Sequence, residues 1–211
     1  MRKFKISRDW YGNGCNIYQK STVAIDPGVT VLVGCNGMGK TTLIKQLKDQ
    51  LKNENVPTLS FDNLHDGGHH ARSAAMFYQD FAFVGASMQS SEGENIALNI
   101  GNFASKIGDF QRRHADAKEL WLFFDAVDSG LSVDNVVELK DVLFRLILEN
   151  RGSTEVYIVV SANEYELARG EACFDVLRCK YTKFSSYERY RNFILKTREI
   201  KDSRVYNSKG R

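Results

Sequence analysis

The chain has 211 residues, 43% of them hydrophobic, and carries 29 basic against 26 acidic side chains, a net charge of +3. This length predicts one domain, residues 1–211, with enough apolar side chains for a sizeable core. So slight a charge does not by itself indicate a nucleic-acid partner. Because no apolar run approaches about 18 residues, we expect neither a membrane-spanning helix nor a secretory signal.

The four cysteines, at positions 15, 35, 173 and 179, form no Cys-x-x-Cys pair. Cytosolic proteins keep their thiols reduced, so this usage predicts free thiols and a cytoplasmic protein. Two prolines in the whole chain indicate no linker, and there is no internal repeat.

The first 28 residues are expected to form an antiparallel β region. Residues 2–10 and 15–25 are alternating or β-rich, and residues 11–14, Tyr-Gly-Asn-Gly, supply the turn between them. A further turn, Asp-Pro-Gly at 26–28, leads into a β-branched strand over 29–33.

Residues 34–41 read Gly-Cys-Asn-Gly-Met-Gly-Lys-Thr and match the pattern G-x-x-x-x-G-K-[ST] at every fixed position. A strand precedes them and a helix over about 41–53 follows, which is the context in which this motif binds phosphate. Glycines let backbone N–H groups surround phosphate oxygens, and the helix amino end adds a positive dipole. A glycine turn that only joins strand to helix is the alternative, and it leaves the Lys-Thr pair unexplained.

This motif assigns ligands for ATP and Mg²⁺. Lys40 is expected to reach the β- and γ-phosphates as a catalytic residue, and the Thr41 hydroxyl to ligate the metal. The predicted ATP-binding residues of this segment are Gly34, Asn36, Gly37, Gly39, Lys40, Thr41 and Thr42.

Strands and helices alternate through the rest of the chain. We predict strands at 58–61, 120–124 and 156–160, and helices at 92–117, 132–150 and 187–203, with a loop over 65–72. The apolar faces expected of the three helices are, in order, Ile96, Ile100, Phe103, Ile107 and Phe110; Val136, Val137, Leu143, Leu146 and Ile147; and Tyr190, Phe193, Ile194 and Ile200. This alternation predicts an α/β fold with a largely parallel central sheet and flanking helices, the P-loop core occupying 29–168.

The apolar strand Leu120–Phe124 ends in Asp125. A carboxylate at the end of a buried strand, downstream of a phosphate loop, is the Walker B arrangement and would hold Mg²⁺ together with Thr41. An aspartate that only caps the next turn is the alternative.

Three segments together resemble the ATP-binding-cassette (ABC) ATPases, over about 23–168. The phosphate loop has the form G-x-N-G-x-G-K-T-T, Ser90–Glu94 is similar to the signature motif L-S-G-G-Q, and Asp128–Ser132 is similar to the D-loop. The resemblance is strongest to the branch that includes structural-maintenance-of-chromosomes and RecF- and RecN-like repair ATPases, including phage or mobile-element members.

This resemblance implies a homodimer that holds two ATP molecules head to tail. Ser91, Gly93 and Glu94 would then contact the nucleotide bound to the second copy. Free N–H groups at a helix start give such a site its affinity for phosphate. The Ser-x-x-Glu spacing of 91–94 is equally that of an ordinary capping box.

The chain departs from the family at the catalytic base. The family usually has Glu directly after the Walker B aspartate, whereas this chain has Ala126, which cannot accept a proton. Three explanations are open: slow hydrolysis aided by another group such as Asp128, an engineered substitution that traps ATP, or a nucleotide-gated clamp that rarely turns over. Our candidate catalytic residues are Lys40, Asp125 and Asp128.

The family's switch histidine is also missing, because the chain reads Ser-Ala-Asn-Glu at 161–164, where Asn163 is the polar substitute. Asn63 is our candidate for the family's glutamine-loop contact, with Gln79 and Gln89 as alternatives. The cluster His-Asp-Gly-Gly-His-His at 65–70 is either a metal site or, as we prefer, a mobile polar loop.

Residues 180–211 are predicted to be a basic helical tail, with 10 basic and 3 acidic residues. Such a tail can bind a polyanion such as DNA, or it can be a solvated terminal helix. We therefore expect an ATPase acting in DNA metabolism, repair or phage biology. The alternatives are an ATP-gated module that controls a partner such as a nuclease and, less favoured, the nucleotide-binding subunit of a membrane transporter.

Overall fold

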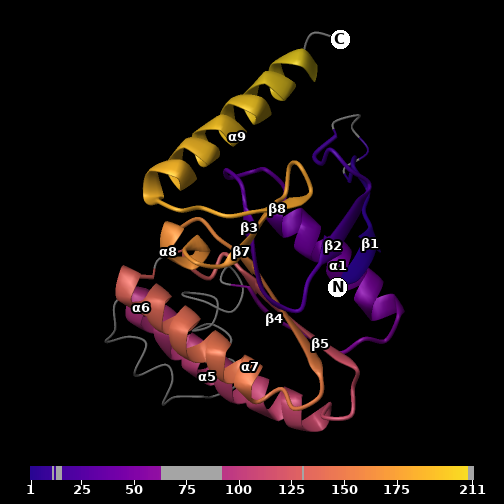
Figure 1. The fold of residues 1–211 in the computed structure, drawn as a ribbon, viewed down its shortest axis with the longest axis vertical. Helices are drawn as coiled ribbons and strands as arrows, with labels where there is room; N and C mark the ends of the chain where they lie inside the picture. Colours follow the sequence, from indigo (N-terminus) through magenta and orange to yellow (C-terminus); the bar gives the residue numbers. More distant parts are fainter. Residues whose placement is uncertain (11, 13–15, 63–91, 130, 209–211) are drawn as a thin grey trace, which may run out of the picture.

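The computed structural model describes residues 1–10, 12, 16–62, 92–129 and 131–208, with the side chains of all these except 92–102 and 204–208. A six-stranded sheet lies at its centre, in the spatial order β4-β5-β6-β3-β7-β8 (Figure 1). Its strands are β3 (Gly28–Val33), β4 (Thr58–Asp62), β5 (Glu119–Asp125), β6 (Glu155–Ser161), β7 (Ala172–Asp175) and β8 (Lys180–Thr182). The first five run parallel, and β8 pairs antiparallel with β7.

A separate two-stranded sheet forms the predicted antiparallel region. It consists of β1 (Arg2–Lys5) and β2 (Thr22–Ile25), with Phe4 opposite Val23. Together with the mostly parallel sheet and its flanking helices, this confirms the predicted P-loop fold class.

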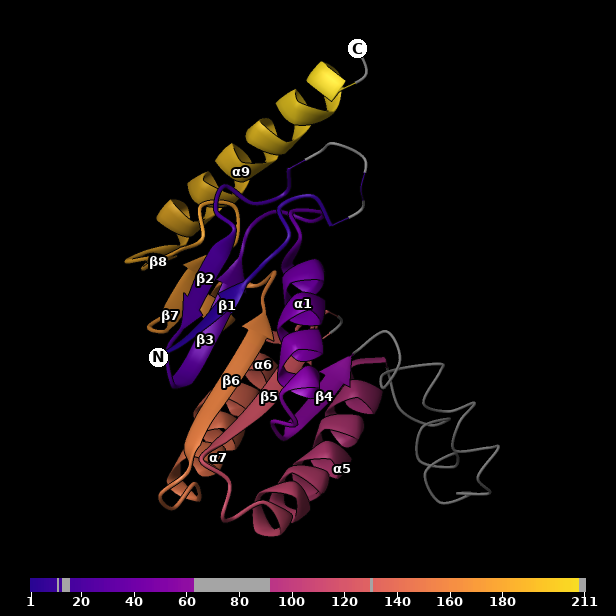
Figure 2. The same ribbon diagram turned by 90° about the vertical axis from the view of Figure 1, so that its right-hand side faces the viewer.

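The helices cover both faces of the central sheet. They are α1 (Lys40–Asn53), α5 (Glu92–Arg113), α6 (Val133–Glu138), α7 (Arg145–Glu149), α8 (Tyr165–Ala168) and α9 (Tyr187–Ser208), and a π-helical segment η1 (Leu139–Phe144) joins α6 to α7. In Figures 1 and 2, α5, α6 and α7 lie on one side of the sheet and α1 on the other.

Alternate residues of each strand build two cores. In β5, Leu120, Leu122 and Phe124 pack with α5 and η1, whereas Trp121 and Phe123 pack with α1 and the β1–β2 sheet. Successive strand side chains point to opposite faces, so a continuous apolar run is what a strand covered on both sides requires. The burial of β5 between two helical layers places Asp125 rigidly at its carboxyl end.

The helix predicted for 132–150 is present but its buried face differs. Val136 and Ile147 are buried as expected, whereas Val137 and Leu146 are 37% and 47% exposed. Leu139 and Phe144, at the two ends of η1, are buried in their place. A π turn holds more residues than an α turn, so it rotates the face that follows it and defeats a count based on the α period.

The carboxyl-terminal region contributes strands to the central sheet before its final helix begins. The sheet continues through β7 beyond residue 168, the predicted end of the core, and residues 180–182 are a strand rather than helix. Strands of four and three residues carry too few positions for a periodic signal, which is why the sequence did not reveal them. The helix α9 begins at Tyr187, and its predicted apolar stripe packs on the core through Tyr190, Phe193, Ile194 and Ile200.

The described residues bear on two further expectations, the absence of a membrane-spanning helix and the reduced state of the cysteines. No helix in the described part of the chain is long and apolar enough to cross a membrane. Cys35, Cys173 and Cys179 are buried free thiols, and burial raises the pKa of Cys173 to about 12. Cys15 lies outside the described residues.

Candidate nucleotide-binding site

The phosphate loop, residues 34–41, borders a hollow of about 310 Å³ at the carboxyl ends of β3, β5 and β6. Parallel strands end at the same edge of a sheet, which brings together residues that are far apart in the sequence. The lining residues are Ile17, Asn36, Gly37, Met38, Gly39, Lys40, Thr41, Thr42, Asp125, Ala126, Ser161 and Asn163.

Glycine is required at position 39 for two reasons. Its φ angle is +92°, in the left-handed region, and a Cβ there would lie 2.5 Å from Ile17 Cγ2. The Tyr18 hydroxyl also donates a 2.8 Å hydrogen bond to the carbonyl oxygen of Gly39. The segment before β2 therefore packs directly on the loop and fixes its path where α1 begins.

Lys40 is a nearly buried cation, 8% exposed. Its Nζ donates to Gly34 O at 2.8 Å and to Asn163 Oδ1 at 3.1 Å, which leaves a third donor for an anion. Burial lowers the pKa of Lys40, and this shift is opposed chiefly by the negative charge of Asp128. A bound phosphate would offset the same desolvation and favour the charged amine.

Thr41 and Asp125, the predicted metal ligands, lie side by side. Thr41 Oγ1 donates to Asp125 Oδ1 at 3.2 Å, and the Ser161 hydroxyl donates to the same carboxylate oxygen at 2.6 Å. Hydroxyl and carboxylate oxygens are the hard ligands that Mg²⁺ prefers. Ser161, at the end of β6, thus orients the Asp125 carboxylate, a role the sequence did not assign to it.

Ala126 has a left-handed backbone, with φ +53°, immediately after the strand. Its amide donates to Ser161 Oγ at 2.7 Å, and the residue lines the hollow. Non-glycine residues pay for this conformation, so the surrounding hydrogen bonds must hold it. The position therefore borders the hollow in which phosphates would bind, although an alanine there offers no base.

Asp128, suggested above as a catalytic residue, is not among the residues that line the hollow. Its Oδ2 accepts the backbone N–H groups of Asn163 at 2.5 Å and Glu164 at 2.7 Å, and the side chain is 3% exposed. Burial raises the pKa of Asp128, while these two amides lower it in part. A carboxylate so engaged positions the loop after β6; it places Asn163, the polar substitute for the switch histidine, beside Lys40.

Contacts from outside the hollow also hold the phosphate loop. Thr197 and Lys201 of α9 bond the loop backbone at Cys35 N (3.1 Å) and Asn36 O (2.9 Å). Sequence reasoning missed both because more than 160 residues separate them from their partners. A threonine inside the apolar stripe of α9 was the one available signal.

Several predicted site residues lie outside the described residues: Ser91, Asn63, Gln79, Gln89 and the cluster at 65–70. Gly93 and Glu94 fall in the first turn of α5, where the backbone alone is described. In the described part of the chain, no three His, Cys, Asp or Glu side chains gather to hold a metal ion.

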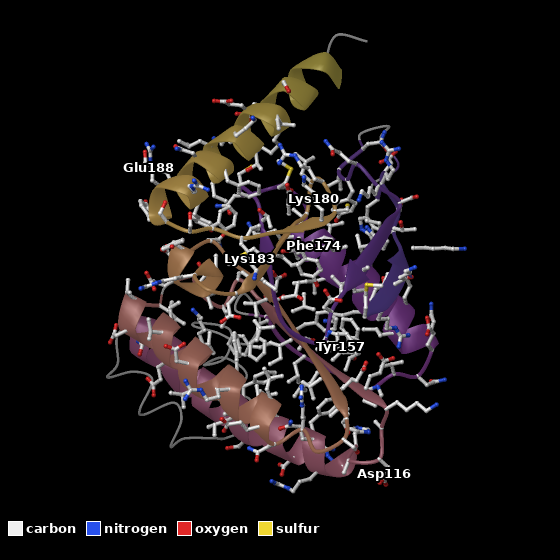
Figure 3. The ribbon with its side chains drawn as sticks, in the orientation of Figure 1. Asp116, Tyr157, Phe174, Lys180, Lys183 and Glu188 are labelled. Carbon is white, nitrogen blue, oxygen red and sulfur yellow. The ribbon has the colours of Figure 1, made fainter. Side chains whose placement is uncertain are left out.

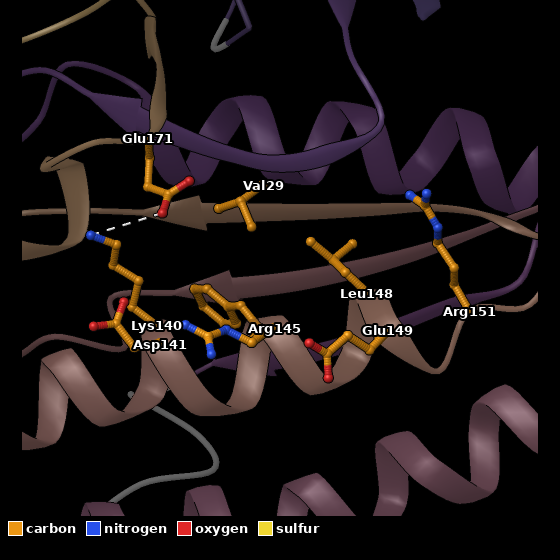
Figure 4. Close-up of a pocket in the computed structure, with 9 residues that line it drawn as sticks. Val29, Lys140, Asp141, Arg145, Leu148, Glu149, Arg151 and Glu171 are labelled. Carbon is orange, nitrogen blue, oxygen red and sulfur yellow. Dashed lines mark ion pairs between the residues drawn. The ribbon is translucent and has the colours of Figure 1, made fainter.

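A second hollow, of about 480 Å³, lies between η1–α7 and the beginnings of β3 and β7 (Figure 4). Val29, Phe144 and Leu148 contribute its apolar surface. Its amine, Lys140, already pairs with Glu171 at 3.8 Å and donates to the carbonyl of Arg169. With a further contact to Glu166 O at 3.4 Å, Lys140 has a protein partner for each of its three N–H donors, whereas Lys40 has two such partners. The first hollow is therefore the better candidate site.

A family model described as an AAA domain matches residues 24–160, from within β2 to the next-to-last residue of β6. This match covers more than half of the chain. The chain belongs to this family. It is a P-loop NTPase of the AAA type, a class that binds ATP with Mg²⁺, and the matched region contains the phosphate loop and Asp125. No curated protein matches the chain.

The residues present fit Mg-ATP. Gly39 leaves no room for a Cβ beside Ile17, the buried Lys40 has an unused donor, and the Thr41–Asp125 pair could supply two oxygen ligands. Bound Mg²⁺ would neutralise charge on the phosphates. The protein's own part would be to hold the triphosphate through backbone amides and Lys40 and to keep the Asp125 carboxylate oriented through Thr41 and Ser161.

Proposed function

We propose that this chain is an ATPase resembling the ABC type, which binds Mg-ATP at the phosphate loop and dimerises head to tail around it. The juxtaposition of Lys40, Thr41 and Asp125 in one hollow is the observation that carries ATP binding. The motif order described above, with Asp128-Ser129 following the Walker B strand, supports the ABC-like branch.

Nucleotide binding is tested by titrating the fluorescent analogue mant-ATP into the wild type and into Lys40→Ala. We expect affinity to fall about tenfold or more, because a charge-assisted contact to phosphate is lost. Lys45→Ala removes an exposed lysine from the same helix and is the matched control. Equal binding by Lys40→Ala would refute this site.

The dimer is tested by sedimentation with Mg-ATP and with Mg-ADP. A dimer formed only with ATP supports trans contacts from Ser91, Gly93 and Glu94, and Ser91→Arg should then abolish it without changing mant-ATP affinity of the monomer. A monomer with both nucleotides removes the head-to-tail arrangement and leaves ATP binding standing.

A low-turnover clamp acting on a partner protein, such as a nuclease, is the second candidate. Among the described lining residues of the hollow, Asp125 is the one carboxylate, and Ala126 occupies the position of the usual base. Hydrolysis then lacks a group to accept the proton of the attacking water. Phosphate release at background in the wild type favours the clamp, whereas easily measured turnover favours the ATPase.

DNA is the macromolecular partner we propose for the basic end of the chain. Exposed basic side chains lie at Lys180, Lys183, Arg189, Arg191, Lys196 and Arg198, against exposed acids at Glu188 and Glu199. Figure 3 shows Lys180 and Lys183 beside the sheet and Glu188 at the start of α9. Phosphate contacts release counterions, so binding should fall steeply with salt. Salt-independent binding would contradict this proposal.

A further inference from the structure

One face of α9 carries groups directed at the nucleotide site. Tyr190, Ile194, Thr197 and Lys201 are spaced by four, three and four residues, which aligns them along the helix. Thr197 is fully buried within this otherwise apolar stripe. Buried hydroxyl groups in proteins are normally hydrogen-bonded, and the Thr197 hydroxyl has two backbone partners.

Thr197 fixes the first peptide of the phosphate loop. Its hydroxyl donates to Ile194 O at 2.8 Å and accepts the N–H of Cys35 at 3.1 Å. In a trans peptide the N–H and the preceding carbonyl point in opposite directions. The Gly34 carbonyl therefore faces away from α9, where it accepts Lys40 Nζ at 2.8 Å.

Lys201 fixes the peptide between Asn36 and Gly37. Its Nζ donates to Asn36 O at 2.9 Å, and a Cβ on Gly37 would lie 3.5 Å from it. With this carbonyl held toward α9, the Gly37 N–H is directed to the other side of the loop. Gly37 lines the hollow, so this amide is presented to the phosphates.

Tyr190 acts at the opposite wall of the hollow. Its hydroxyl donates to Asn163 O at 2.9 Å, while Asn163 Oδ1 accepts Lys40 Nζ at 3.1 Å. The two described acceptors of Lys40 are thus both held by α9. Thr197 holds the peptide that contains Gly34 O, and Tyr190 bonds the backbone of Asn163.

We infer that α9 is part of the nucleotide site, and that Thr197 and Lys201 are positioning residues that orient the phosphate-loop peptides, with Tyr190 doing the same for Asn163. This inference rests on the nucleotide binding proposed above. It goes beyond the family, because the match ends at residue 160 and includes no part of α9. None of the three residues is among those that line the hollow. Each acts through a backbone group of the phosphate loop or of Asn163.

The test compares mant-ADP affinity with thermal stability for Thr197→Val, Thr197→Ser and Lys201→Met. We expect Thr197→Val to weaken mant-ADP about tenfold and Lys201→Met about threefold, since each removes one hydrogen bond that orders the loop. Thr197→Ser keeps the hydroxyl and should restore wild-type affinity. A residue that served stability alone would lower the melting temperature and leave the affinity of the folded protein unchanged.

Ser203→Ala is the matched control for Thr197. Ser203 donates to Ile200 O at 2.9 Å, which is the same i to i−3 backbone contact six residues further along α9. Unlike Thr197, Ser203 is exposed. Lys52→Met, at an exposed site on α1, is the control for Lys201. Both should bind mant-ADP as the wild type does.

The outcomes separate this inference from the proposed function. If the wild type binds neither mant-ATP nor mant-ADP, both fall together. If the wild type binds and Thr197→Val and Lys201→Met bind equally well, or Thr197→Ser fails to restore affinity, this inference alone is overturned. Should Thr197→Val not fold, Lys201→Met decides, because that side chain is only partly buried.

Discussion

The Ser161 hydroxyl joins the ends of two adjacent strands by donating to Asp125 Oδ1 at 2.6 Å while accepting the Ala126 amide at 2.7 Å. One side chain thereby orients the carboxylate at the end of β5 and secures the left-handed residue that follows it. The strand β6 lies between the strand of the phosphate loop and the strand of Asp125, so its end faces both. The orientation of the candidate metal ligand Asp125 therefore depends on its neighbour Ser161 as well as on Thr41.

Replacing this hydroxyl should impair metal-dependent binding. In Ser161→Ala, Asp125 loses an orienting donor and the Ala126 amide loses its acceptor, which should destabilise the protein by about 1–3 kcal/mol. Binding of mant-ATP in EDTA should be little changed, whereas the gain on adding Mg²⁺ should shrink. Ser153→Ala, an exposed serine in the turn before β6, serves as control. A full magnesium effect in Ser161→Ala would show that Asp125 needs no orienting partner.

The requirement for glycine at position 39 can be separated into strain and steric exclusion. Gly28 and Gly39 have nearly equal φ angles, +94° and +92°, but a Cβ on Gly28 meets nothing within 4 Å. Gly28→Ala should cost about 1 kcal/mol of stability from backbone strain and keep nucleotide affinity. Gly39→Ala adds the clash with Ile17 and should abolish mant-ATP binding. Equal effects of the two substitutions on affinity would argue against a close-packed phosphate loop.

Ala126 is the natural place to restore a base. Ala126→Glu would put a carboxylate on the lining of the hollow, beside Asp125, and should raise phosphate release above the wild-type rate. Ala126→Gln has the same size and backbone cost without a proton acceptor, and it should leave the rate unchanged. An equal rise with both variants, measured in a phosphate-release assay, would show that the effect is not base catalysis.

The buried Asp128 carboxyl predicts a pH-dependent contribution to stability. Because burial raises its pKa above the ordinary value of 3.8, the folded state binds this proton more tightly than the unfolded state. Its contribution is therefore fully present below the unfolded pKa and is lost as pH rises through the folded pKa. In urea unfolding from pH 3.5 upward, at about half-unit steps, Asp128→Asn should lack this loss. Parallel wild-type and variant curves would contradict the assignment.

Much of the fold follows from local patterns. The run 120–124 is apolar at every position, and only a strand covered on both faces buries all of them. In α5, Phe103, Ile107 and Phe110 repeat with the helical period and are buried as predicted. The inward face of 132–150 could not be counted in this way, because η1 changes the number of residues in a turn.

The candidate site divides along the same line. Glycines at fixed spacing, followed by Lys40 and Thr41, identify a phosphate loop because its chemistry resides in consecutive residues. Asp125 is recognisable because it ends an apolar strand. Asp128, by contrast, had the right residue type and neighbourhood, yet two backbone amides occupy its carboxylate.

The sequence alone therefore determined the fold class and the phosphate loop and predicted Asp125 as the Walker B carboxylate, since each rests on residues close together in the chain. Only the tertiary structure decided that Ser161 orients Asp125, that Asp128 anchors the Asn163 loop, and that α9 grips the phosphate loop through Thr197 and Lys201. Those relationships join segments up to 165 residues apart. Which side chain completes a hydrogen bond across such a distance depends on how the strands and helices pack, and no local pattern records it.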